Sequence, residues 1–95
     1  MKKSAPVAGA FGDAAPSPAF NVAAAFATRE QSRRSGTPIR ILKVVRRETQ
    51  VVAGTNLRMR VVALRNGATP ETADIVVYQP LFGQQQLTSW RWLGR

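Results

Sequence analysis

The feature that most limits what this chain can fold into is a change of sequence period after Pro38. Before that point apolar residues recur at helical spacing, whereas beyond it they alternate with polar ones. The alternation is clearest over residues 56–63, where Leu57, Met59 and Val61 are separated by arginines. A two-residue repeat is that of a strand with one buried and one wet face. The chain therefore predicts a helix followed by a sheet.

Both ends of the predicted helix carry recognisable signals. Ser17 and Pro18 resemble an N-cap residue followed by proline at the first helical position. Gly36 and Pro38 end the helix, because glycine accepts the left-handed conformation and proline cannot continue the hydrogen-bond ladder. We predict one helix over about residues 18–34. Its apolar side chains at helical spacing are assigned to the core: Val22, Ala23 and Phe26.

Four strand-like segments follow the helix, at residues 39–50, 56–63, 73–78 and 87–92. Asn66-Gly67 is the strongest hairpin signal, because both residues tolerate the positive φ of a type I′ turn. The predicted fold is α+β, with one N-terminal helix packed across a four-stranded antiparallel sheet.

Residues 1–16 form an Ala-, Pro- and Gly-rich segment with little periodicity. Such a composition buries too little apolar surface to order itself, so we predict a flexible arm over 1–16 and one domain over 17–95. Met1-Lys2-Lys3 resembles the start of a signal peptide, but Ser4 and Pro6 interrupt the apolar run that a signal needs. We interpret the segment as an arm, and the compartment stays open.

The chain contains neither cysteine nor histidine. It therefore has no disulfide and no thiolate nucleophile. It also lacks the imidazole that serves as the usual general base and as the commonest metal ligand. We expect a protein that is not an enzyme, that uses no metal or other cofactor, and whose stability comes from packing alone.

Positive charge dominates the composition, with 14 Lys and Arg against five Asp and Glu and a formal charge of +9. Such a charge steers association with acidic surfaces. We expect no membrane span, because the longest apolar runs are short. A nucleic-acid partner is the weaker alternative, because no recognised nucleic-acid motif is present. The basic residues of the strands are assigned to the wet face of the sheet: Arg40, Lys43, Arg46, Arg47, Arg58 and Arg60.

The turn between the first two strands carries a family pattern. Gln50-Val51-Val52-Ala53-Gly54 fits the Q-x-V-x-G motif of cystatins at every defined position. Residues 24–30 resemble the A-R-F-A-V-x-E helix signature of plant cystatins, with departures at Ala25 and Thr28. From about Ser17 to Trp92 the chain resembles the disulfide-free cystatins, namely the plant cystatins and stefins.

The resemblance implies a reversible competitive inhibitor of papain-like cysteine proteases. In that family an N-terminal trunk and two hairpin loops form a wedge that fills the active-site cleft. Carried over to this chain, the trunk bends at Gly9 or Gly12, with Gly9 slightly favoured by its distance to the helix. The first loop comprises Gln50, Val51, Val52, Ala53 and Gly54, and the second comprises Pro80 and Leu81. We expect a monomer, with a domain-swapped dimer as an alternative.

The topology gives these loops a common location. One joins the first strand to the second and the other joins the third to the fourth, so both lie at the same end of the sheet. The second loop departs from the family, because Leu81 follows Pro80 where a tryptophan is usual. An aromatic anchor contributes on the order of 1–3 kcal/mol to an interface. Leu81 and Phe82 offer apolar surface of a different shape.

Two other functions stay open. The fold also serves as a non-inhibitory or engineered binding module. A nucleic-acid-binding domain would depend on Arg58 and Arg60 rather than on Gly54. Trp90 and Trp92 flank Arg91 on the last strand, but we assign them to the edge of the helix–sheet core rather than to base stacking.

Overall fold

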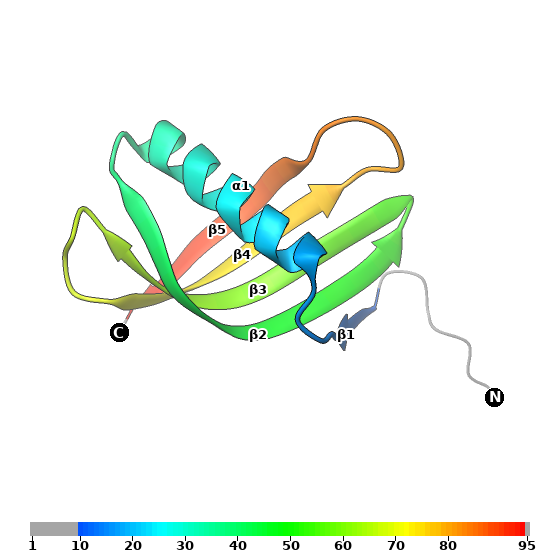
Figure 1. Cartoon of the computed structure of the whole chain (residues 1–95), viewed down its shortest axis with the longest axis horizontal. Helices are drawn as coiled ribbons and strands as arrows, with labels where there is room; N and C mark the ends of the chain where they lie inside the picture. The colour runs from blue at the N-terminus through cyan, green and yellow to red at the C-terminus, as the bar shows by residue number, and fades with distance from the viewer. Residues whose placement is uncertain (1–9, 95) are drawn as a thin grey trace.

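A computed structural model describes residues 10–94 as one helix and a five-stranded antiparallel sheet (Figure 1). The strands follow one another in chain order across the sheet. Within the described residues, no helix combines the length and apolar character needed to cross a membrane. The predicted α+β arrangement is confirmed. Its elements are β1 (Phe11–Asp13), α1 (Pro18–Ser35), β2 (Ile39–Val52), β3 (Gly54–Arg65), β4 (Glu71–Gln79) and β5 (Gln86–Gly94).

The sheet has one strand more than the four that the sequence predicted. β1 comes from the predicted arm and pairs antiparallel with β2, so that Phe11 lies opposite Gln50 and Asp13 opposite Glu48. The Ala14 N–H extends the pairing by donating to the Arg47 carbonyl at 2.9 Å. Three residues are too few to show a two-residue repeat, so the sequence gives no sign of this strand. They become a strand because they pair with the N–H and C=O groups at the edge of β2.

The ends of α1 agree with the sequence signals. The Ser17 carbonyl accepts the N–H of Phe20 at 3.1 Å, although the Ser17 side chain makes no capping hydrogen bond. Gly36 adopts a left-handed φ of 68° and its N–H donates to the Ser32 carbonyl at 3.0 Å. The predicted type I′ turn is also present, with φ of 54° at Asn66 and 69° at Gly67.

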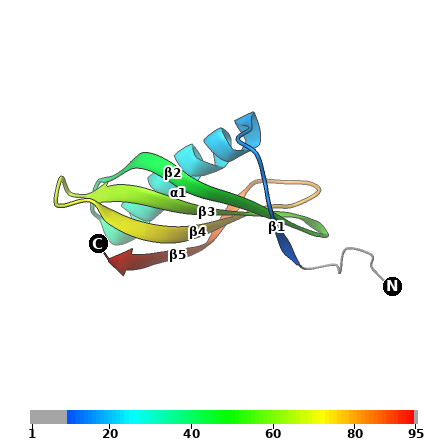
Figure 2. The same ribbon diagram turned by 90° about the horizontal axis from the view of Figure 1, so that it is seen from below.

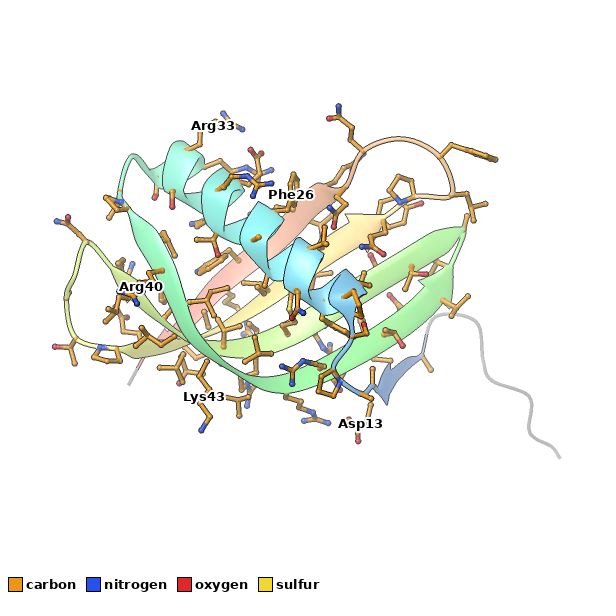
Figure 3. All side chains as sticks on the ribbon, viewed as in Figure 1. Asp13, Phe26, Arg33, Arg40 and Lys43 are labelled. Carbon is orange, nitrogen blue, oxygen red and sulfur yellow. The ribbon has the colours of Figure 1, made fainter. Side chains whose placement is uncertain are left out.

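One face of the sheet is buried beneath α1, as the two views in Figures 1 and 2 show. The helix contributes Phe20, Ala23 and Ala27 to this core. The predicted core position of Val22 is wrong, since its side chain is 55% exposed. At 100° per residue Val22 lies about 200° around the helix from Phe20, the large side chain that sets the buried face. Ala23 is buried as predicted, and Phe26, labelled in Figure 3, packs partly buried against the core.

The opposite face of the sheet, which we call the open face, is not covered by the helix. Directly paired residues of antiparallel strands share a face. Because Arg47 pairs with buried Met59, it lies on the helix side, and its assignment to the wet face is wrong. Two bulges interrupt the alternation of faces along β2, one between Ile41 and Lys43 and one between Val44 and Arg46. Because each bulge adds a residue to the strand, a simple two-residue repeat does not predict the face of Arg47.

The two tryptophans of β5 lie on the helix side. Trp90 pairs with Ile75 and Trp92 with Ala73, and both indoles pack against the core as predicted. The Arg65 guanidinium stands 4.3 Å from the centre of the Trp92 ring. These rings therefore close the core at the β5 edge rather than face solvent as a stacking platform.

The rotation of α1 can be tested by truncating one residue from each face. Phe20→Ala should lower the free energy of unfolding by about 3–5 kcal/mol, because it leaves a cavity in the core. Val22→Ala should change it by no more than about 0.5 kcal/mol, because the side chain already faces water. Urea denaturation monitored by tryptophan fluorescence measures both. A larger loss for Val22→Ala than for Phe20→Ala would show that the helix face is assigned incorrectly.

Candidate functional site

The predicted first loop is a tight reversal between β2 and β3. β2 ends at Val52, β3 begins at Gly54, and Ala53 alone connects them. The side chains of Val51 and Val52 are 70% and 40% exposed. Apolar side chains therefore stand in water at the tip of the longest hairpin of the sheet.

Gly54 is buried and has a φ of 109°, which side chains rarely adopt. A Cβ placed on it would lie 3.0 Å from the Pro80 Cα and 3.1 Å from the Tyr78 Cε1, and closer still to the Gln79 carbonyl oxygen. The family resemblance placed this glycine in the first loop of the wedge. The structure adds an internal reason, because only glycine lets the first loop pack against the end of β4.

Tyr78 supplies a second connection between the two loops. Its hydroxyl donates a hydrogen bond to the Ala53 carbonyl at the tip of the first loop. The sequence treated Tyr78 only as a strand residue. Its position two residues before Pro80 is the signal that could have identified it, since that spacing places the ring beside the second loop.

The second loop runs between β4 and β5, over residues 80–85. Gln79 and Gln85 meet at its base, where the Gln79 Nε2 donates to the Gln85 Oε1 at 3.2 Å. Beyond Pro80, the side chains of Leu81 and Phe82 are 72% and 90% exposed. Phe82 was not among the predicted site residues, yet it is the most exposed large apolar side chain of the described residues.

Together the two loops form what we call the apolar edge, made of Val51, Val52, Leu81 and Phe82. Both lie at the same end of the sheet in Figures 1 and 2, as the topology predicted. Exposed apolar side chains that gather in one place mark interaction surfaces, whereas scattered ones need no explanation. This end of the molecule is therefore the strongest candidate for contact with a partner protein.

The other predicted site residues lie beside this edge. The Gln50 side chain accepts a hydrogen bond from the Asn56 Nδ2 at 2.7 Å, which ties it to β3 on the open face. Gly12 lies in β1 opposite Thr49, and a Cβ added to it would meet nothing within 4 Å. Gly9 lies outside the described residues. The structure thus brings together the two loops and places Gly12 beside β2, opposite the residue before Gln50.

Comparison with known proteins gives three findings. A family described as aspartic acid proteinase inhibitor matches residues 16–93. A curated protein of Actinidia chinensis var. chinensis named cysteine proteinase inhibitor 1 is 39% identical over 69 residues, which are 72% of this chain and 59% of that protein. The chain thus spans about three-fifths of that relative's length.

The third finding is a solved structure, the salivary cystatin of the soft tick Ornithodoros moubata. It superposes with a TM-score of 0.73 at 25% sequence identity, covering 88% of this chain and 96% of the tick protein. The match therefore supports the same overall fold for this chain.

The packing role of Gly54 can be separated from its backbone conformation. Gly83 has a similar φ of 100°, but a Cβ added to it would meet nothing within 4 Å. Gly83→Ala should therefore cost only the backbone strain, about 1 kcal/mol. Gly54→Ala should cost about 2 kcal/mol more, because it also collides with the β4 backbone. Urea denaturation compares the two, and equal losses would rule out the contact between the loops.

Proposed function

This chain belongs to the aspartic acid proteinase inhibitor family within the cystatin superfamily, and we propose that it is a reversible, competitive protein inhibitor of papain-like cysteine proteases. The observation that carries the proposal is the apolar edge, where two loops some 25 residues apart in sequence expose four apolar side chains together. Binding in an apolar cleft removes these side chains from water, which favours association. In this role the protein acts by binding alone, without catalysis.

The proposed mechanism is a wedge. Val51, Val52 and Ala53 enter the cleft from one side of the catalytic residues and Pro80, Leu81 and Phe82 from the other. The close packing of Gly54 and the hydrogen bond of Tyr78 hold both loops in place before binding. This order lowers the conformational entropy lost on association.

The trunk is the third part of the wedge. Because β1 pairs Gly12 with Thr49 of β2, the backbone at Gly12 has little freedom to bend. This favours Gly9 over Gly12 as the bend. The residues around Gly9 would then contact the protease beside the first loop, while β1 anchors the arm to the domain.

A second candidate function is inhibition of aspartic proteases. The description of the matching family favours it. So does Leu81, which stands where cystatins usually carry a tryptophan that contacts cysteine proteases. The same apolar edge would then occupy the substrate cleft of a different class of enzyme.

Titration against two proteases distinguishes the candidates. The wild-type chain should inhibit a papain-like enzyme competitively, and Phe82→Ala should raise the inhibition constant about tenfold or more by removing an exposed aromatic anchor. Val22→Ala, which truncates an exposed apolar side chain on the outer face of α1, should leave the constant unchanged. The same series is run against a pepsin-like enzyme at acidic pH.

Each pattern of inhibition has its own meaning. Inhibition of the pepsin-like enzyme alone, weakened by Phe82→Ala, would assign the edge to aspartic proteases. Absence of inhibition of either enzyme at micromolar protein would leave the binding-module alternative. Inhibition that falls equally with Phe82→Ala and Val22→Ala would contradict the assignment of the apolar edge.

A further inference from the structure

The open face of the sheet carries a row of charged side chains that the apolar edge does not use. Arg46, Arg60, Asp74 and Arg91 pair in turn across β2, β3, β4 and β5. The next row toward the loops contains Glu48 opposite Arg58. Two arginines directly opposite each other, as Arg46 and Arg60 are, repel unless something holds them.

Two carboxylates, those of Glu48 and Asp74, form ion pairs with these arginines. Glu48 accepts from the Arg58 Nε at 2.7 Å and lies 3.2 Å from an Arg46 nitrogen. Asp74 accepts two bonds from Arg60, each of 2.9 Å, and lies 3.7 Å from Arg91. Each carboxylate is thus shared by two guanidinium groups, so that each set of three keeps one positive charge.

Burial separates the two signs of charge. The carboxylate side chains are only 11% and 18% exposed, whereas the four arginine side chains are between 38% and 71% exposed. Solvent therefore meets mostly guanidinium groups. One further acid, Asp13 of β1, lies at the margin of this row (Figure 3). Its carboxylate is 3.4 Å from the Arg46 guanidinium, and its side chain is 83% exposed.

The charges persist over a wide pH range. The hydrogen bond from Arg58 lowers the pKa of Glu48, and that from Arg60 lowers the pKa of Asp74. The carboxylates in return raise the pKa of both arginines. Each guanidinium has five N–H donors, and the carboxylates use only some of them. Beside these groups lies a hollow of about 200 Å³ lined by Arg46, Glu48, Arg58, Arg60 and Asp74.

We propose that the open face is a binding site for a linear anionic polysaccharide, whose carboxylate or sulfate groups bind the outward N–H groups of Arg46, Arg58, Arg60 and Arg91. A guanidinium presents parallel donors that match such oxyanions. Neighbouring strands are about 4.8 Å apart, so the arginines offer a series of positive charges rather than a single one. A polymer with repeated anions meets several of them at once.

Two observations favour a glycan over other polyanions. Nucleic acid bases stack on free aromatic rings. Of the described rings on the open face, Phe11 lies 4.0 Å from the Arg58 guanidinium and Tyr78 is tied by its hydroxyl to the Ala53 carbonyl at the first loop, whereas both tryptophans lie on the helix side. The centre of a protein–protein interface is depleted of charged residues, whereas here the centre consists of them.

The site is separate from the apolar edge. Arg58 and Arg60 are four and six residues from Gly54 along β3, about 13 and 20 Å at the rise of a strand. The proposal therefore does not rest on protease inhibition, and the two sites can be occupied together.

The test compares two double variants that remove the same charge from opposite sides of the sheet. Arg46→Gln/Arg91→Gln removes the more distant partner of each carboxylate and leaves Arg58 and Arg60 bound to them. The matched control, Arg29→Gln/Arg34→Gln, removes two charges from α1 and leaves Glu30 bound to Arg33 at 2.8 Å. Urea denaturation confirms that both variants are folded.

Dissociation constants are measured by fluorescence titration with heparin and with polygalacturonate at 150 mM salt. We expect the open-face double variant to bind about tenfold more weakly and the helix variant less than about threefold more weakly. Asp13→Asn should tighten binding about twofold, because it removes an exposed acid at the margin. This variant keeps the proposal testable even if the arginine substitutions disturb the sheet.

Three results would overturn the proposal. Equal losses in the two double variants would mean that only the total charge matters. Absence of binding to either glycan at 150 mM salt would remove the site itself. Tighter binding of a single-stranded oligonucleotide than of both glycans, with the same dependence on Arg46 and Arg91, would show that the ligand class is wrong.

Discussion

One helix covers one face of this sheet, and the rest of the molecule follows from that packing. The buried side of β3 and β4 is apolar and fully removed from water, and α1 closes it with Phe20, Ala23 and Ala27. Because residues 10–94 place no second layer on the other face, that face meets solvent and carries arginines and their carboxylates. Burial of apolar area on one side thus leaves the charged side free to acquire a function of its own.

The same architecture joins the two loops of the apolar edge. Consecutive hairpins of a meander place alternate turns at one end, but nearness alone does not fix their shape. The close approach of Gly54 to Gln79 and Pro80 and the hydrogen bond from Tyr78 to Ala53 do. The edge is therefore built before a partner arrives, and Phe82 is presented on a loop whose base is closed by Gln79 and Gln85.

Local signals predicted those parts of the fold that depend on local physics. The ends of α1, the turn at Asn66-Gly67 and the alternation along β3 and β4 were all predicted from backbone preferences and side-chain period. The failures have tertiary causes. β1 exists because β2 has a free edge, Val22 faces water because Phe20 sets the helix rotation, and Arg47 changes face because β2 bulges.

The sequence by itself determined the fold class, the family resemblance and the apolar composition of both loops, because helix signals, strand period and the Gln50–Gly54 motif are all contained in short stretches. Only the tertiary structure decided that Gly54 is needed against the second loop, that Phe82 is the most exposed part of the edge, and that Glu48 and Asp74 lie beneath the arginines. Each of these depends on contacts between different strands or on exposure to solvent. No local pattern records how closely such segments approach, because strand register and side-chain packing are set only when the whole sheet has formed.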